Sequence, residues 1–395
     1  MHLVIVSPFP PAITGIGQYG YHITRGLATS GVFTRINVLA GSHVNGQTPN
    51  HLGITEIEYC WAPGELNARQ AILSGVKRLN PDLVWFNAGV SIFGKSPWLN
   101  FSGLLTPMLI QRMGYPTVVT QHELVELTDL RALNAPGGLF AKTGAQLLTG
   151  ITARADLVCL TMKNYADWLS ARGVDCMHIP IGAYHEPELL ADSDAQELLF
   201  FTTLAPFKGL ELLLKAFEIL RCEFPGLKLT IAGSTHTRFP NYAQELKSLN
   251  EAKDGINWLG QTSEDDVMEL FRRAQIVVLP YSASTGSSSV LYQAATWGRP
   301  VVASDLNEIR KLVAESNLQV EFFKSGNVES LCRSIRDLLL AREKRRGQAE
   351  HNFNAIQRTR PHETCRKYIQ AFNRALEKRL SSKRISVPAA EKKPA

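Results

Sequence analysis

The stretch that decides the fold is IVVLPYSASTGSSSVLYQAATWGRPVVASDL, residues 276–306. Its first four residues are apolar and rich in β-branched side chains, which predicts a buried strand that Pro280 ends. A loop of small residues follows, then an expected helix over 290–297 and a second strand that begins at Val301. This order predicts a βαβ unit whose loop lies at the carboxyl end of the first strand.

The loop over 282–289 has the composition of an anion site. Gly286 and the serines Ser287, Ser288 and Ser289 keep bulk away from the backbone, just before the expected helix begins. The first N–H groups and the positive dipole end of a helix attract phosphate. An ordinary strand-to-helix turn capped by serine is the simpler alternative.

The same segment resembles the donor-site signature of retaining GT-B glycosyltransferases, a family with many mannosyl- and glucosyltransferases. That signature has Pro-Ser, then Glu-Gly, a second glutamate seven residues after the first, and Ala-x-x-x-Gly-x-Pro-Val-Val. The residues in register here are Gly286, Ala294, Gly298, Pro300, Val301 and Val302. Thr285 and Gln293 stand where the family has its glutamates. Gln293 can still hydrogen-bond ribose hydroxyls and Thr285 a sugar hydroxyl, but neither carries charge.

A second motif surrounds Lys208. The family has G-R-L-x-x-x-K-G between a strand and a helix, and its two cations bind the donor diphosphate. The chain reads TTLAPFKG at 202–209, so the lysine is kept and Thr203 replaces the arginine. The resemblance therefore implies a diphosphate contact from Lys208 without the bidentate arginine clamp. Arg238 is a candidate for the missing cation.

His122 ends an expected strand that starts at Thr117. In the resembled family a histidine at this place reaches the donor sugar or the reacting carbon, so His122 is a candidate catalytic residue with Lys208. A structural histidine at a strand end is the alternative, and Glu123 is a weaker candidate. Gly233 and the segment 259–261 stand where the family contacts the nucleotide, although both could be simple turns.

Residues 15–20, GIGQYG, match the dinucleotide fingerprint G-x-G-x-x-G literally. The fingerprint needs its first glycine directly after the first strand, whereas residues 7–14 intervene here, and no acidic residue closes the second strand. We expect a long proline-glycine loop that feeds the first helix. By resemblance, Gly15 and Gly17 lie near the donor diphosphate.

The only D-x-D sequence is Asp192-Ser193-Asp194, which lies in an expected linker away from any strand end. No other cluster has metal-ligand spacing. We therefore expect no bound metal and no cofactor besides the donor, so that protein cations and helix N-termini meet the charge of the leaving group.

Two series of strands alternate with helices along the 395 residues, which predicts two α/β domains with parallel sheets covered on both faces. With the resemblance, the fold class is GT-B: two Rossmann-like, doubly wound domains that face a central cleft. The expected parts are an acceptor-side domain, a linker, a nucleotide-sugar-binding domain, a terminal helix that packs back on the first domain, and a disordered basic tail. Their bounds are 1–187, 188–197, 198–360, 361–380 and 381–395.

Charge and composition restrict the partners and the location that we expect for the protein. The net charge is +6, but the chain from Arg342 onward carries 15 Lys or Arg and 5 Asp or Glu, so the rest has a net charge of −4. This basic end could meet anionic lipid, or it could be a solvated helix and tail. The stretch lacks the interleaved aromatics of a nucleic-acid site. No apolar run could span a membrane, no signal peptide is visible, and six scattered cysteines indicate reduced thiols, so we expect a cytoplasmic protein. A peripheral location at the inner membrane face is the alternative left open by the basic end.

The resemblance implies a glycosyltransferase that moves a hexose from a nucleotide-diphosphate sugar to a saccharide or lipid-linked acceptor with retention, and the motifs in the chain lead us to expect that it works without metal. The nucleotide and the sugar stay open. The missing glutamates and arginine leave a non-catalytic GT-B subunit as an alternative. A sugar-nucleotide epimerase on the same fold is a lesser one, because the acid-base residues that it needs have no visible counterparts.

Overall fold

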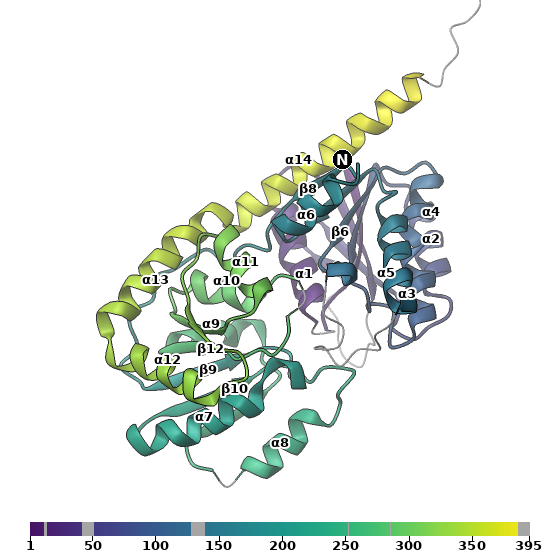
Figure 1. Ribbon diagram of the computed structural model, residues 1–395. Coiled ribbons are helices and arrows are strands. Elements are labelled where there is room, and N and C mark those ends of the chain that lie inside the picture. The colour runs from purple at the N-terminus through teal and green to yellow at the C-terminus, as the bar shows by residue number, and fades with distance from the viewer. Residues whose placement is uncertain (12–13, 42–50, 128–138, 252, 285, 386–395) are drawn as a thin grey trace, which may run out of the picture.

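The computed structural model describes residues 1–11, 14–41, 51–127, 139–251, 253–284 and 286–385, which form two α/β units (Figure 1). In the first unit the described residues form an eight-stranded sheet in the order β3-β4-β2-β1-β5-β6-β7-β8. Its strands are β1 (His2–Pro8), β2 (Arg35–Gly41), β3 (His51–Leu52), β4 (Thr55–Trp61), β5 (Leu83–Ala88), β6 (Thr117–Gln121), β7 (Leu157–Leu160) and β8 (Cys176–His178).

The second unit holds a six-stranded sheet in the order β11-β10-β9-β12-β13-β14. All of its strand pairs are parallel. The strands are β9 (Glu197–Phe201), β10 (Lys228–Ala232), β11 (Ile256–Gly260), β12 (Ile276–Leu279), β13 (Val301–Ser304) and β14 (Glu321–Phe323).

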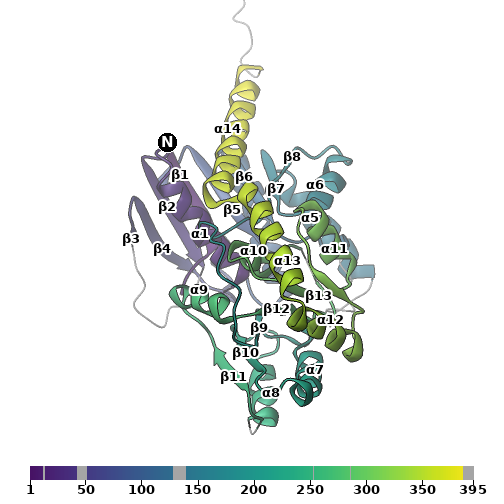
Figure 2. The same ribbon diagram turned by 90° about the vertical axis from the view of Figure 1, so that its left-hand side faces the viewer.

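Helices cover both faces of each sheet, as Figures 1 and 2 show. In the first unit they are α1 (Gly15–Ala28), α2 (Ala68–Leu79), α3 (Pro97–Leu104), α4 (Thr106–Arg112), η1 (Val125–Leu127), α5 (Leu139–Thr152) and α6 (Lys163–Ser170). The remaining helices are η2 (Pro206–Lys208), α7 (Leu210–Glu223), α8 (Tyr242–Asn250), α9 (Glu264–Arg273), α10 (Ser289–Thr296), α11 (Asn307–Glu315), α12 (Val328–Leu340), α13 (Arg342–Ile356), η3 (Gln357–Thr359) and α14 (Pro361–Ile385).

Alternation along the buried strands gives each sheet two apolar faces. In β1, Leu3 and Ile5 pack in the core beneath α1 and α14, whereas Val4 and Val6 pack in the core beneath α2 to α4. The second sheet is divided in the same way, with α7 and α12 on one face and α9 to α11 on the other. Burial on both faces explains why its strands read as continuous apolar runs.

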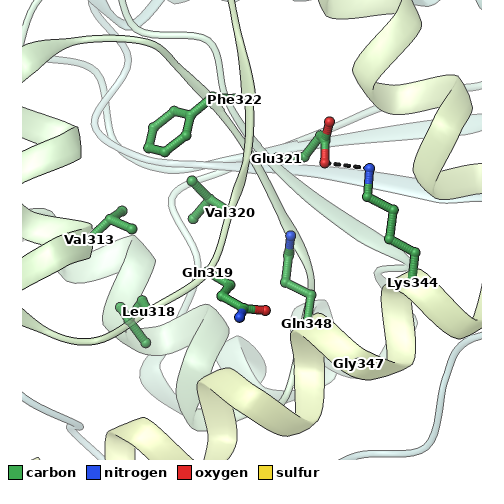
Figure 3. Close-up of a pocket in the computed structure, with 9 residues that line it drawn as sticks. All are labelled: Val313, Leu318, Gln319, Val320, Glu321, Phe322, Lys344, Gly347 and Gln348. Atoms are coloured by element: carbon green, nitrogen blue, oxygen red, sulfur yellow. Dashed lines mark ion pairs between the residues drawn. The ribbon is translucent and has the colours of Figure 1, made fainter.

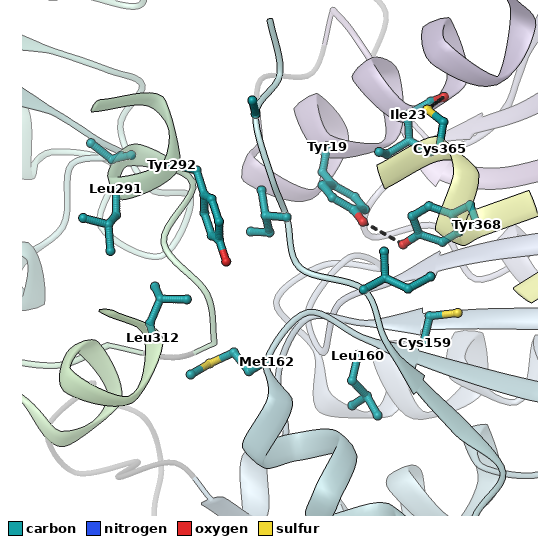
Figure 4. Packing of buried hydrophobic residues seen from close by; sticks show 14 of the residues in the cluster. Tyr19, Ile23, Cys159, Leu160, Met162, Leu291, Tyr292, Leu312, Cys365 and Tyr368 are labelled. Carbon is teal, nitrogen blue, oxygen red and sulfur yellow. Dashed lines mark hydrogen bonds between the residues drawn. The ribbon is translucent and has the colours of Figure 1, made fainter. Parts of the chain in front are cut away.

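The last helix, α14, returns from the second unit and packs on the first (Figure 1). Tyr368 lies in the first half of this helix and is fully buried against Trp85 of β5 and Phe372 of its own helix. Its hydroxyl lies 2.7 Å from the hydroxyl of Tyr19 and 2.8 Å from Oγ1 of Thr120, so α14 is tied to α1 and β6 by hydrogen bonds inside the core (Figure 4). A buried hydroxyl needs such partners to offset the loss of water.

Three features differ from the sequence prediction. The first sheet is not wholly parallel, because β3 and β4 are joined through a turn at Gly53 that is too short for a parallel crossover. Helix α1 begins at Gly15, since Oγ1 of Thr14 caps it by accepting the Gly17 N–H at 2.9 Å, so the glycines lie in the helix and not in a loop. Helix α14 continues to Ile385, five residues past the expected end, and the expected tail over 386–395 lies outside the described residues.

The D-x-D segment contacts helix α13 through an ion pair of Asp192. The Asp192 carboxylate accepts a 2.8 Å hydrogen bond from Nη2 of Arg345, a buried residue of α13. The Arg345 guanidinium also donates to the carbonyl oxygen of Leu338 at 2.6 Å, at the end of α12. The carboxylate therefore balances a buried charge that joins the linker to two helices.

We expect Asp192→Ala to lower the free energy of unfolding by roughly 3 kcal/mol, because it leaves the Arg345 guanidinium buried without its counter-charge. The matched control is Asp194→Ala: Asp194 is exposed, so the change should cost less than about 0.5 kcal/mol. Urea unfolding of both variants measures the difference. Equal losses would show that Asp192 carries no special structural charge.

Candidate active site

The strand order places two loops of the second unit side by side. In both sheets the order reverses, between β1 and β5 and between β9 and β12. Connections leave toward opposite faces at such a point, which opens a crevice at the carboxyl ends of the strands where ligands bind in open α/β sheets. The loops that follow β9 and β12 carry Lys208 and Gly286, so the fold itself brings the two predicted motifs together.

The turn at Lys208 is fixed by a close backbone contact. Gly209 has φ 72° and is the N-cap residue of α7, and a Cβ at this position would lie 1.9 Å from the carbonyl oxygen of Pro280. Only glycine fits this place. The N–H of Ser282 donates to the carbonyl oxygen of Phe207 at 3.0 Å, so the two loops are joined at two points.

Lys208 is half-buried and lies over an aromatic ring. Its Nζ is 4.0 Å from the ring centre of Tyr281, a distance suited to a cation–π contact. Burial lowers the pKa of Lys208 to about 8, and the nearby Glu123 carboxylate of the first unit opposes this shift. Tyr281 is buried, and its hydroxyl donates to Oγ1 of Thr202 at 3.3 Å. The candidate phosphate ligand is thus a partly buried cation that lies over a buried aromatic ring.

Gly286 is one of the points at which the two units touch. It has φ 64°, and a Cβ there would lie 2.2 Å from the carbonyl oxygen of His122 in the first unit. Its N–H donates to the hydroxyl of Tyr165 in α6 at 3.2 Å. This N–H, which the sequence assigns to phosphate, therefore has a protein partner in the structure.

The rest of the donor motif lies on α10. Ser287 precedes the helix, Ser288 is its N-cap residue in an extended conformation, and Ser289 is its first residue. Gln293 follows one turn later and is buried. Thr285 lies outside the described residues.

His122 is buried at the end of β6 beside this loop. Its Nε2 lies 2.7 Å from Oδ1 of Asn87, and its ring meets the Tyr19 ring edge-on with centres 4.8 Å apart. Burial lowers the pKa of His122 to about 4, so the ring is neutral at pH 7. Asn87 also donates a hydrogen bond to the carbonyl oxygen of Ile16, which lies between Gly15 and Gly17 in the chain. Through Asn87 these glycines therefore lie near His122.

Gly233 lies where two backbone segments of the second unit approach each other closely. A Cβ there would lie 1.8 Å from the carbonyl oxygen of Thr202, and its N–H donates to the carbonyl oxygen of Gly260 at 2.7 Å. Beside it, Phe207, His236 and Phe239 form a cluster with ring centres between 5.7 and 6.1 Å apart. Arg238, the candidate cation, lies over the Phe239 ring at 5.2 Å.

Three residues of the site escaped the sequence analysis: Asn87, Tyr165 and Tyr281. Asn87 gave a usable signal, because it is a polar residue near the carboxyl end of an otherwise apolar strand. Tyr281 directly follows Pro280, where the family signature has serine, which was a second signal. Tyr165 lies on α6 among ordinary helix residues and gave none.

Two of the hollows among the described residues bear on the location of the site. One borders the site and is lined by residues after β5 and β6 and by α5, including Gln121 and Glu123. The other is formed by β14, the outer strand of the second sheet, with α13, and contains a 2.6 Å ion pair between Lys344 and Glu321 (Figure 3). None of the predicted donor residues lines this second hollow.

Within the described part of the chain, no group of three or more His, Cys, Asp or Glu side chains could hold a metal ion. In the same residues no helix combines the length and the apolar character that crossing a bilayer requires.

Comparison with known proteins gives a consistent result for the second unit. Residues 185–354 match the family described as Glycosyl transferases group 1. An uncharacterized glycosyltransferase of Haemophilus influenzae is 27% identical over 154 residues, which are 38% of this chain and 41% of that protein. A phosphatidyl-myo-inositol mannosyltransferase of Propionibacterium freudenreichii is 28% identical over 145 residues, 35% of each protein. The matches thus span about two fifths or less of these relatives.

Solved structures extend the likeness to the whole fold. Sucrose-phosphate synthase from Thermosynechococcus elongatus has a TM-score of 0.72 at 17% identity, covering 95% of this chain and 99% of that chain. Anabaena HepE in complex with UDP-glucose has a TM-score of 0.69 at 16% identity, covering 97% and 100%. The chain is therefore a GT-B protein, built of two Rossmann-like domains that face each other. Its second domain is similar to the family of group 1 glycosyl transferases, over a match that covers less than half of the chain.

The contacts of Lys208 predict its titration. We expect its amino group to titrate near pH 8. In the variant Glu123→Gln the midpoint should move lower still, because the carboxylate favours the charged form. The pH dependence of acetylation at Lys208, followed by mass spectrometry, measures both midpoints. A midpoint near 10, as in an exposed lysine, would contradict the burial of this side chain.

Proposed function

We propose that the protein transfers a hexose from a nucleotide-diphosphate sugar to a saccharide or lipid-linked acceptor. The observation that carries the proposal is the meeting of Lys208, the start of α10 and His122 at the carboxyl edges of both sheets. The match of residues 185–354 to a glycosyltransferase family supports it. UDP-glucose, the ligand of Anabaena HepE, is the first donor to test.

In this proposal the second domain holds the donor. Lys208 contacts the diphosphate, and the N–H groups at the start of α10 face its other oxygens. Gly286 can offer its N–H only when the Tyr165 hydroxyl is displaced, so donor binding changes a contact between the domains. Binding and the relative position of the two domains are thereby coupled.

In the proposed transfer step, the protein must stabilise the negative charge that develops on the departing diphosphate. The bond between the anomeric carbon and the diphosphate oxygen breaks, and a bond forms from the acceptor oxygen to the same face of that carbon. The acceptor proton passes to the departing diphosphate. Lys208 and the α10 N-terminus stabilise the negative charge that develops on the leaving group. We propose retention because the resemblance to retaining GT-B enzymes implies it and the signature supplies no carboxylate nucleophile.

The acceptor and its location are proposed from the relatives. The names of two similar proteins specify a phosphatidyl-myo-inositol mannosyltransferase and a lipopolysaccharide N-acetylglucosaminetransferase, which act on saccharide or lipid-linked acceptors. For such acceptors we propose that the protein works in the cytoplasm, with its basic C-terminal end in peripheral contact with anionic lipid.

A non-catalytic GT-B subunit is the second candidate, and specific residues favour it. Thr203 and Gln293 replace charged groups of the donor signature, and the Gly286 N–H is bonded to Tyr165. Calorimetric titration with UDP-glucose and GDP-mannose, followed by product analysis, separates binding without transfer from catalysis.

Lys208→Ala should weaken nucleotide-sugar binding by about ten- to hundredfold, since a charge-assisted contact to phosphate contributes roughly 1.5–3 kcal/mol. Because the usual arginine is Thr203 here, Lys208 carries more than its ordinary share of this contact. Isothermal titration measures the loss, and thermal unfolding checks that the variant folds.

Thr203→Arg is the matched gain of function for the same contact. It should tighten binding, or recover part of the affinity in the Lys208→Ala background. Unchanged affinity in Lys208→Ala for every sugar nucleotide tested would place the diphosphate elsewhere and favour the non-catalytic subunit.

We also propose that donor binding needs no divalent metal, because the Asp192 carboxylate is occupied by Arg345. Protein treated with EDTA should keep its affinity for the sugar nucleotide. The measurement is a titration before and after adding manganese. A large loss on chelation that manganese restores would overturn this part of the proposal.

A further inference from the structure

In the first domain, Asn87 connects the start of α1 with His122. It lies on β5 with no exposed surface. Its Nδ2 donates to Oγ of Ser7 at 2.9 Å and to the carbonyl oxygen of Ile16 at 2.9 Å. Its Oδ1 lies 2.7 Å from Nε2 of His122. One side chain therefore binds β1, the first turn of α1 and the candidate catalytic histidine.

These bonds determine which His122 nitrogen carries the proton. A backbone carbonyl only accepts, so the amide nitrogen of Asn87 must face Ile16. Its oxygen then faces His122 and can only accept, which puts the ring proton on Nε2. Nδ1 of His122 is left with its lone pair.

The ring is also held on a second side. Tyr19 packs against it edge-on at an interplanar angle of 85°. The Tyr19 hydroxyl is hydrogen-bonded to Tyr368 of α14 at 2.7 Å, which fixes Tyr19 in turn. The charged groups on the elements that meet here are Glu123, which follows His122 in the chain, and Lys208, whose pKa Glu123 raises. His122 itself is kept neutral by its burial.

We infer that Asn87 is a positioning residue, which holds the His122 ring in one orientation and one tautomer and ties it to the glycine-rich start of α1. Only the effect that we expect on sugar transfer rests on the proposed function. The Nδ1 atom of a neutral His122 ring protonated on Nε2 accepts hydrogen bonds, so it can pair with a hydroxyl group, which donates. It cannot pair with a deprotonated phosphate oxygen, which only accepts. Aspartate could not replace Asn87, because a carboxylate cannot donate to the Ile16 carbonyl.

The state of the ring can be measured in the unaltered protein. Long-range ¹⁵N–¹H NMR correlation of labelled histidine should show the His122 proton on Nε2, and this signal should not titrate between pH 5 and 8. The assignment comes from its loss in His122→Ala. A proton on Nδ1, or protonation above pH 6, would overturn the inference whatever the protein catalyses.

The effect on transfer needs a variant and a matched control. Asn87→Ser should lower kcat by about 100-fold, because small displacements at a reacting centre cost rates of this size. Calorimetric affinity for the nucleotide sugar, which the second domain binds, should change little. In the double variant with His122→Ala the loss should equal that of His122→Ala alone, since Asn87 acts through the ring.

Asn100→Ser is the control, because Asn100 is another buried asparagine of the same domain, with three hydrogen bonds around the start of α3. It should reduce stability but leave kcat unchanged. A folded Asn87→Ser protein with the kcat of Asn100→Ser would overturn the inference, as would additive losses in the double variant. If Asn87→Ser does not fold, the NMR measurement decides. An unaltered protein that transfers no sugar would refute the proposed function and leave the NMR test standing.

Discussion

The reversal of strand order between β9 and β12 is the constraint on which the candidate site depends. Because helices leave these neighbouring strands toward opposite faces, their loops are not covered and can lie against each other. Glycine makes the contact possible: Gly209 touches the Pro280 carbonyl, and Gly286 touches the carbonyl of His122 across the domains. Side chains at either position would separate Lys208 from the other groups.

The first domain is organised by buried polar contacts instead. Asn87 joins β1, α1 and His122, while Tyr19 connects this group to Tyr368 of the returning helix. Since buried polar groups are costly unless paired, each such contact restricts where the others can lie. The terminal helix therefore supports the packing around His122 although it lies on the sheet face and not at the strand ends.

The altered donor motif has a physical counterpart in the structure. Where the resembled family has an arginine and two glutamates, the register drawn from the sequence gives Thr203, Gln293 and, outside the described residues, Thr285. Lys208 is left as the cation of the motif, and Tyr281 provides it with an aromatic surface. A lysine in this setting is more easily deprotonated than an arginine, so the charge at this motif depends on pH, whereas an arginine at position 203 would stay charged.

The sequence by itself determined the strands and helices, because apolar runs such as 276–279 and breakers such as Pro280 act locally. The alternation of strands and helices also predicted two α/β domains, and the resemblance added the GT-B fold, which the solved structures support. Prediction from the sequence missed the cap at Thr14, which starts α1 at Gly15, within the stretch that was expected to be a loop. Only the tertiary structure decided the partners of Asn87, Tyr165 and Tyr281. The partners of Asn87 are 35, 71 and 80 residues away, and Gly286 is 121 residues from Tyr165. No local pattern encodes such pairs, because they exist only once two sheets and a returning helix have packed.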